Sequence, residues 1–153
     1  MKVHIATDHA GLEFKDKLKT HLELQGYAVE DHGAYEYDAN DDYPGFIIAA
    51  AEAVAADWRT GDKSLGVVFG GSGNGEQIAA NKVHGIRAAL VWNESTAQLA
   101  RQHNDANVIS IGARQHSEQD ALHLIDVFLS EPFSGEERHV RRIGQIADYE
   151  ESR

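Results

Sequence analysis

The sequence predicts an α/β fold, a three-layer α-β-α sandwich with a parallel sheet of about five strands and an extra C-terminal helix. Short, nearly continuous apolar runs occur along the chain, as is typical of strands that are covered on both faces. Longer amphipathic segments alternate with these runs, and strand–helix alternation is characteristic of a parallel sheet. The length of 153 residues suits one domain, which we expect to span residues 1–153.

The predicted strands are the apolar runs at residues 3–6, 28–30, 65–69, 88–92 and 108–111. Helices are predicted at residues 11–25, 44–57, 76–82, 94–103 and 118–130. Gly26 is a stop signal for the first helix, and Pro44 suits the first turn of the second. A last helix is predicted to begin near Ser134, because Ser134 and Glu137 match a capping box. Right-handed crossovers favour a Rossmann-like sheet with the flavodoxin-like strand order 2-1-3-4-5.

The composition restricts the class of protein and the kinds of chemistry. The chain has no cysteine, which excludes disulfides, a thiolate nucleophile and Cys-ligated metals and fits a reducing compartment. Charge occurs too early in the chain for a signal peptide, and no apolar stretch approaches the ~20 residues of a membrane span. We therefore expect a soluble cytoplasmic protein without membrane partners. The net charge of -11 argues against nucleic-acid binding, and a phosphorylated ligand would need a local cationic cluster.

A glycine-rich segment follows the third predicted strand and reads Gly-Gly-Ser-Gly-Asn-Gly-Glu over residues 70–76. Ligands of such sheets bind beyond the carboxyl ends of the strands, here between the first and third strands. The glycines allow successive N–H groups to form an anion cradle, although a tightly packed turn is the alternative. The segment matches neither the dinucleotide fingerprint nor the P-loop, and Asn74 breaks the hydrolase elbow around Ser72.

Acidic and imidazole side chains lie at the same predicted edge. Glu76 suits a general base beside a carbonyl whose oxyanion the cradle stabilises, or it merely complements the helix dipole. Asp8 and His9 follow the first strand and could transfer protons or bind phosphate, or Asp8 caps the next helix. His103 and Asn104 end a helix that runs away from this edge, so they are a helix terminus or serve a site on another subunit.

Basic residues occur near the C-terminus despite the acidic background. Arg114 follows the fifth strand, and Arg138 and Arg142 are four residues apart on one helix face, which suits bidentate phosphate binding. A solvated basic face is the alternative. The other histidines are scattered, and no His-x-x-x-His pair with a supporting acid occurs, so the sequence disfavours a metal site.

Taken together, these segments resemble the ribose-5-phosphate isomerase B family, which includes the galactose-6-phosphate isomerase subunits. The resemblance covers nearly the whole chain and rests on Asp8–Gly11, Asp42–Pro44, Gly70–Glu76, Ile78–Lys82, Arg101–Asn104, Gly112–Arg114, Arg138 and Arg142. It implies a cofactor-free aldose–ketose isomerase that acts on a sugar phosphate. It also implies a homodimer or a larger assembly, such as a tetramer, with active sites shared between subunits.

The resemblance also implies residue roles. Asp8 and His103 would open the sugar ring, with His103 as the proton donor. The backbone of Gly71, Ser72, Gly73, Asn74 and Gly75 would hold the enediolate oxygens, together with the Ser72 side chain. The phosphate would bind to His9, Arg114, Arg138 and Arg142, and Asn104 would bind a sugar hydroxyl.

Many members of the family carry a catalytic Cys where this chain has Gly70, and a similar branch without that Cys uses a Glu at the position of Glu76. The sequence therefore predicts that Glu76 is the base in the interconversion of D-ribose 5-phosphate and D-ribulose 5-phosphate. The alternatives are an isomerase of a six-carbon sugar phosphate, such as galactose or allose 6-phosphate, and a non-catalytic sugar-phosphate-binding module. A hydrolase with Ser72 as nucleophile is a more distant alternative.

Overall fold

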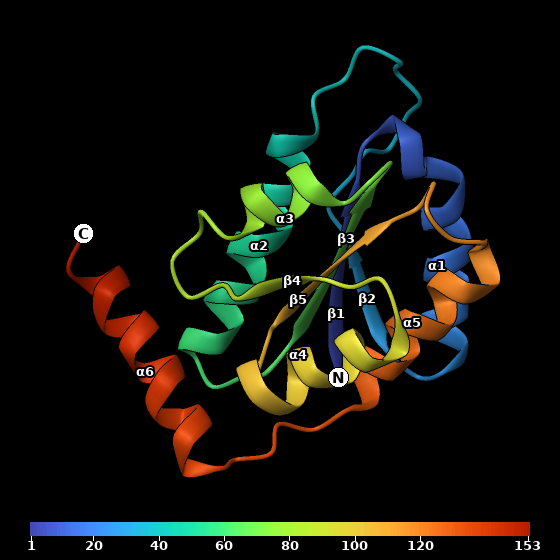
Figure 1. Ribbon diagram of the computed structural model, residues 1–153. Coiled ribbons are helices and arrows are strands. Elements are labelled where there is room, and N and C mark those ends of the chain that lie inside the picture. The colour runs from blue at the N-terminus through green and yellow to red at the C-terminus, as the bar shows by residue number, and fades with distance from the viewer.

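The computed structural model describes residues 1–153 and contains one five-stranded parallel sheet with helices on both faces (Figure 1). The strands are β1 (Lys2–Thr7), β2 (Ala28–Asp31), β3 (Leu65–Gly70), β4 (Ala88–Leu90) and β5 (Val108–Gly112). The helices are α1 (Leu12–Leu24), α2 (Tyr43–Arg59), α3 (Asn74–Ala80), α4 (Glu94–Asn104), α5 (Glu118–Ser130) and α6 (Glu137–Glu151). A short 3-10 turn, η1 (His9–Gly11), precedes α1. The predicted fold class is therefore confirmed.

The strand order is β2-β1-β3-β5-β4, so the predicted order 2-1-3-4-5 is wrong for the last two strands. All five residues of β5 are buried, and this strand pairs with both β3 and β4. β4 has only three residues, two of them partly exposed, and it pairs with β5 alone. The longer, wholly buried run takes the interior position because both of its faces need cover, whereas the short run tolerates the edge.

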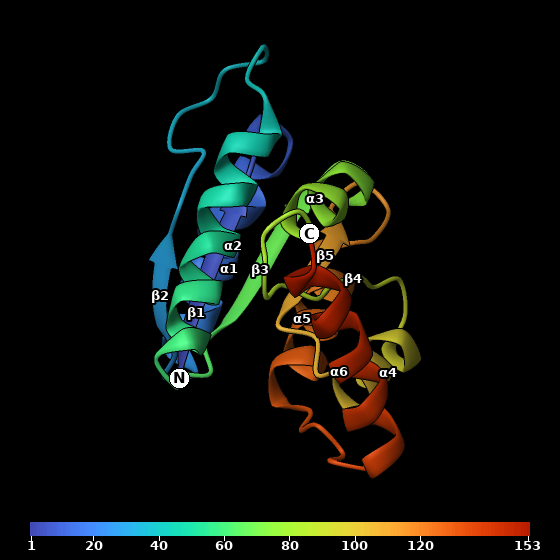
Figure 2. The same cartoon turned by 90° about the vertical axis from the view of Figure 1, so that its left-hand side faces the viewer.

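Two hydrophobic clusters hold the helices against the sheet. The chain moves in one direction across the sheet through α1 and α4 and in the other through α2 and α3, so right-handed crossovers place these pairs on opposite faces. The first cluster includes Leu18 of α1, Ile109 of β5 and Phe128 of α5. The second includes Val54 of α2, Val68 of β3 and Ala80 of α3. Figure 2 shows α2 and α3 in front of the sheet.

The helix ends follow most of the predicted signals. Pro44 lies in the first turn of α2, and Gly26, with φ 92°, follows the end of α1. The predicted capping box at Ser134 is wrong, because α6 begins only at Glu137 and no side chain caps it. The Ser134 hydroxyl instead accepts a bond of 3.3 Å from the N–H of Glu136, which closes a turn two residues ahead.

Two segments extend away from the sheet, and both contain residues that are discussed with the candidate site below. The loop between β2 and α2 projects past the carboxyl ends of the strands (Figure 1). α6 lies along the outside of the molecule near the opposite end and leaves Val140, Ile146 and Tyr149 exposed. No helix of the structure combines the length and apolar character that a membrane span requires.

Candidate active site

The sheet topology brings the two predicted site segments together. β1 and β3 are neighbours, and their register pairs Thr7 with Phe69. Asp8 follows the end of β1 and Gly71 follows the end of β3, so both segments leave the sheet side by side at its carboxyl edge. This is the position where open parallel sheets bind their ligands.

The glycine-rich loop is a tight connection between β3 and α3. Gly73 has φ 83°, in the left-handed region, and a Cβ atom there would lie 2.9 Å from the backbone of Ile111. The exposed Ser72 hydroxyl accepts a bond of 3.3 Å from the N–H of Asn74. A cavity of about 510 Å³ beside the loop is lined by Ser72 and Asn74 but not by Glu76. The loop is therefore a tightly packed turn, and the side chains of Ser72 and Asn74 face outward.

Glu76 is the buried acid of this loop. Its exposed fraction is only 5%, whereas Ser72 and Asn74 are exposed. Its carboxylate lies directly against Gly70, where a methyl group would overlap the Oε1 atom. Burial raises the pKa of the Glu76 carboxyl, the backbone N–H of Glu76 opposes this shift, and the negative charge of Asp8 adds to it. A carboxylate in this environment is a stronger proton acceptor than one in water.

The raised pKa predicts a pH-dependent effect of Glu76→Gln on stability. A carboxyl with a raised folded-state pKa destabilises the folded protein once it is ionised, so stability is lost as the pH rises from the unfolded value through the folded one. Gln resembles the protonated acid and avoids this loss. We expect the variant to be more stable than the parent at about pH 8 and equally stable at about pH 4.5, as measured by urea unfolding. A parent that is the more stable at the higher pH would contradict the prediction.

Asp8 and His9 are held in place by local hydrogen bonds. Asp8 caps η1, where its Oδ1 accepts a bond of 2.9 Å from the N–H of Ala10. The His9 Nδ1 atom lies 2.6 Å from the Oδ1 of Asp41, which also accepts from the His9 N–H at 3.3 Å. Asp41 therefore fixes the imidazole and leaves its Nε2 atom for a ligand.

Asp41 and Tyr43 are site residues that the sequence did not identify. Both come from the loop between β2 and the start of α2, and the Tyr43 hydroxyl lies against Gly75 of the cradle. The signal for Asp41 is weak, since it is one of several acids in an exposed loop. Tyr43 belongs to the Asp42–Pro44 motif, but the motif alone assigned it no role.

Arg114 is the cationic residue at the carboxyl ends of the strands. Its guanidinium lies beside Gly71, with Nη1 3.4 Å from the place a Cβ would take. Its backbone N–H donates to the Gly71 carbonyl at 3.1 Å, which ties the start of the loop to the end of β5. The side chain is exposed and can reach an anion in the space above the loop.

The other predicted residues lie elsewhere in the chain. His103 and Asn104 end α4 just before β5 begins, at the amino edge of the sheet. The His103 ring stacks on His139 of α6, with ring centroids 4.2 Å apart. Burial lowers the pKa of His139, and His103, Arg138 and Arg142 add to this effect because all three lie near it. One chain thus carries a carboxyl-edge cluster, at the carboxyl ends of the strands, that contains the acids Asp8, Asp41 and Glu76. It also carries a basic amino-edge cluster, near the amino ends of the strands, that contains His103, His139, Arg138 and Arg142.

The arginines of α6 differ in their partners. Arg138 Nε lies 3.1 Å from Glu136, and Arg141 Nη1 lies 2.8 Å from Glu137. Arg142 forms no ion pair within the chain, so its guanidinium is available to another group. Asn104 lines a cavity of about 520 Å³ under α6, together with Ile146 and Tyr149.

Comparisons with known proteins agree along nearly the whole chain. The family model described as Ribose/Galactose Isomerase matches residues 3–146. Ribose-5-phosphate isomerase B of Mycolicibacterium paratuberculosis is 53% identical over 150 residues, which cover 98% of this chain and 92% of that protein. The protein of the same name from Mycobacterium tuberculosis is 52% identical, with 98% of this chain and 90% of that protein covered.

Solved structures also match nearly the whole chain. Ribose-5-phosphate isomerase B from Mycoplasma genitalium, with bound ribulose-5-phosphate, has a TM-score of 0.93 at 42% identity. That match covers 99% of this chain and 97% of the other. Ribose-5-phosphate isomerase B of Clostridium thermocellum has a TM-score of 0.91 at 39% identity, with 99% of both chains covered.

Proposed function

Because this chain belongs to the ribose/galactose isomerase family, we propose that it interconverts D-ribose 5-phosphate and D-ribulose 5-phosphate with Glu76 as the base. The chain is an aldose–ketose isomerase. The observation that carries the mechanism is the buried Glu76 carboxylate, which lies against Gly70 at the end of β3 and has a raised pKa. No step of this mechanism requires a metal ion or an organic cofactor.

The reaction begins with opening of the sugar ring, for which Asp8 accepts and His103 donates a proton. Glu76 then removes the proton from C2 of the aldose, and the electron pair forms a cis-enediolate. The N–H groups of 71–75 and the Ser72 hydroxyl stabilise its oxygens, and each such donor is typically worth about 2.7–4 kcal/mol of barrier. A proton then moves from O2 to O1 of the enediolate, and the protonated Glu76 returns its proton to C1, which completes the ketose.

The position of His103 supports an active site shared between two subunits. His103 lies near the amino ends of the strands and Glu76 lies near their carboxyl ends, so one chain cannot bring both to one sugar. In a twofold homodimer the amino-edge cluster of one subunit meets the carboxyl-edge cluster of the other, twice. Asn104, Arg138 and Arg142 then reach the substrate beside His9 and Arg114. Larger assemblies such as tetramers are compatible with the same pairing.

Mixing two inactive variants tests the shared site. Glu76→Gln and His103→Gln each inactivate every site of their own homodimers. After joint unfolding and refolding, half of the dimers are mixed and contain one intact site, so activity should return to about a quarter of the parent value. The control is a mixture of each variant with itself, which should stay inactive. Failure to regain activity in the mixed sample would refute sharing while leaving the role of Glu76 intact.

The unpaired guanidinium of Arg142 suits binding of the substrate phosphate. We expect Arg142→Ala to raise KM about 10- to 100-fold with little change in kcat, since a charge-assisted hydrogen bond is worth about 1.5–3 kcal/mol. Arg141→Ala is the matched control, because Arg141 lies on the same helix and is paired with Glu137. An unchanged KM in the Arg142 variant, measured in a coupled assay, would contradict this role.

Solvent exchange separates the isomerase from a sugar-phosphate-binding module. In deuterated water the enzyme should introduce deuterium at C1 or C2 of the sugar, which NMR detects, whereas a binding module introduces none. Assays across ribose, galactose and allose phosphates decide between five-carbon and six-carbon substrates. We expect ribose 5-phosphate to have the highest kcat/KM.

One sheet anchors both hydrophobic clusters, which supports a single isomerase domain over residues 1–153. A cytoplasmic location is proposed from kinship with metabolic enzymes. We propose neither nucleic-acid nor membrane partners, since the net charge of -11 opposes the first and the site needs only a small sugar phosphate.

A further inference from the structure

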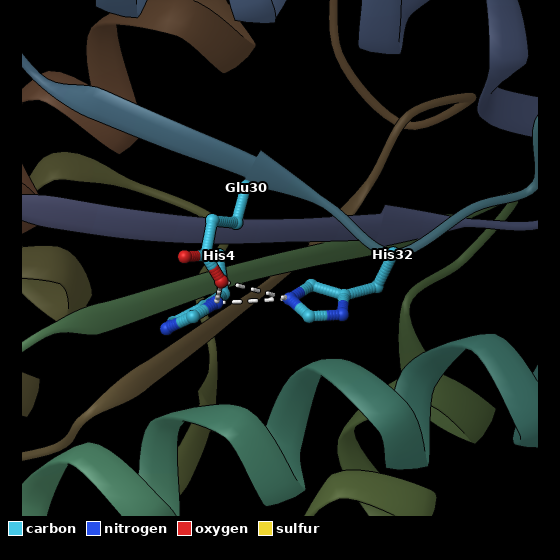
Figure 3. A group of neighbouring side chains, drawn as sticks. All are labelled: His4, Glu30 and His32. Atoms are coloured by element: carbon cyan, nitrogen blue, oxygen red, sulfur yellow. Dashed lines mark hydrogen bonds and ion pairs between the residues drawn. The ribbon is translucent and has the colours of Figure 1, made fainter.

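A second group of polar side chains lies away from the glycine-rich loop, between the sheet and α2. His4 of β1 pairs in register with Glu30 of β2, and His32 follows two residues later (Figure 3). Residues two apart on a strand point to the same face, so all three side chains face α2. Asp8 is four residues beyond His4, or roughly 13 Å at 3.3 Å per residue. The group is therefore separate from the isomerase site.

The facing atoms of these side chains are spaced like the ligands of one ion. His4 Nδ1 lies 2.9 Å from His32 Nε2 and 3.2 Å from Glu30 Oε2, and the last two atoms are 4.0 Å apart. Ligands at 2.0–2.1 Å from a tetrahedral zinc ion are about 3.3 Å from one another. Only small side-chain shifts separate the observed spacing from that geometry.

A fourth side chain fixes the orientation of His4. The His4 Nε2 atom lies 2.8 Å from the Oδ2 of Asp57 on α2, and His4 is only 1% exposed. Nε2 donates its hydrogen to this carboxylate, which leaves a lone pair on Nδ1 toward His32 and Glu30. A carboxylate that accepts from the outer nitrogen of a ligating histidine is the usual support of a metal site.

The three facing atoms contact one another, and the hydrogen bond between His4 Nδ1 and His32 Nε2 is the contact that an ion would replace. Lys2 Nζ lies 3.6 Å from Glu30 Oε1 and 3.6 Å from Asp57 Oδ2, so it contacts the oxygen of Glu30 that faces away from the imidazoles. Glu30 lies on the edge strand β2 and is exposed, and His32 lies just beyond this strand and is partly exposed, which gives an ion a path to the buried His4.

We propose that His4, His32 and Glu30 bind one divalent transition-metal ion, such as zinc, with Asp57 as the outer support. Two imidazoles and one carboxylate are a donor set that zinc accepts, with a fourth position left for water. The ion would link the edge strand β2 to β1 and, through Asp57, to α2. Because it binds the folded state, it should raise the stability of the protein.

The test uses the full-length protein after treatment with a chelator. Cobalt(II) is added as a spectroscopic probe, and zinc is then added to displace it and to report its own affinity. His32→Gln and Glu30→Gln remove one ligand each from the exposed side of the group. His123→Gln is the matched control, because His123 lies 3.3 Å from Glu94, both are exposed, and no third ligand is present. His9→Gln tests the other cluster of possible ligands, Asp8, His9 and Asp41.

We expect one equivalent of cobalt per chain with the visible absorption of a four-coordinate site. Zinc affinity should fall at least tenfold in the His32 and Glu30 variants and remain unchanged in the His123 variant. Zinc should raise the Tm of the parent above that of its own chelated form, and it should not raise the Tm of the His32 variant. Absence of a stoichiometric site, equal affinity in all variants, or a loss confined to His9→Gln would overturn the proposal. Isomerase activity is not the readout, so failure here leaves the proposed reaction untouched.

Discussion

Replacing Glu76 with Gln is expected to lower kcat for ribose 5-phosphate about a thousandfold while the substrate still binds. Gln has the size of Glu and can fill the same buried space, but its amide cannot accept the C2 proton. The cradle of 71–75 and the cationic groups do not depend on the charge of residue 76, so substrate affinity should change little. Stopped assays give kcat, and isothermal titration with ribose 5-phosphate gives the affinity.

The pH dependence of the parent enzyme provides a second measure of the same group. Glu76 must be ionised to act as a base, so kcat/KM should fall as the pH drops through its pKa. Burial raises that pKa, and the acidic limb should therefore lie above the range of an ordinary glutamate. Glu52→Gln, on the exposed side of α2, is the control and should retain full activity. A Glu76 variant that keeps a tenth of the parent kcat would exclude Glu76 as the base.

Adding a single methyl group at Gly70 should inactivate the enzyme almost as thoroughly. In the Gly70→Ala variant the added Cβ atom would overlap the Glu76 carboxylate, which must then move from its buried position. Misplacement of a catalytic group by about 1 Å can cost a hundredfold in rate, and we expect at least this loss in kcat. The loss should appear in kcat rather than in KM, because the cationic groups remain in place.

Two comparisons make the Gly70 prediction specific. Gly45→Ala adds the same methyl group on α2, where no atom lies within 4 Å, and should leave activity unchanged. Gly70→Ala added to Glu76→Gln should cause little further loss, since both changes act on the same carboxylate. Fully additive losses in the double variant would show that the methyl group acts elsewhere.

The part of the fold that could be predicted is the part that depends on local pattern. Apolar runs and amphipathic segments identified the five strands and six helices, and the signal is strongest for β3 and β5, because burial on both faces leaves a continuous apolar run. The order of β4 and β5 was missed, since strand order depends on which crossover skips a neighbour rather than on local pattern. The apolar run at 88–92 is longer than the run at 108–111, so length gave no sign that β4, which has only three residues in the structure, belongs at the edge.

The residues of the candidate site also differ in how far local pattern predicts their positions. Glu76, Asp8 and Arg114 follow strand ends, so the topology of a parallel sheet predicts their meeting. Asp41 comes from a long loop whose path has no periodic signal, and Tyr43 begins α2 where that loop ends, so neither could be placed beforehand. The pairing of His4, Glu30 and His32 was missed for a similar reason. His-x-x-x-His spacing is typical of ligands on a helix, whereas these three side chains are brought together by the register of two strands.

The close contact between Gly70 and Glu76 also constrains how such enzymes can change over evolution. A side chain at position 70 and a carboxylate at position 76 claim the same volume, so a Cys in the first position and a Glu in the second cannot coexist in this geometry. A lineage that moves from a thiolate to a carboxylate therefore passes through an ancestor that is either crowded or without any proton acceptor. Exchange between the two chemistries needs paired substitutions, or a period in which selection on the enzyme is relaxed.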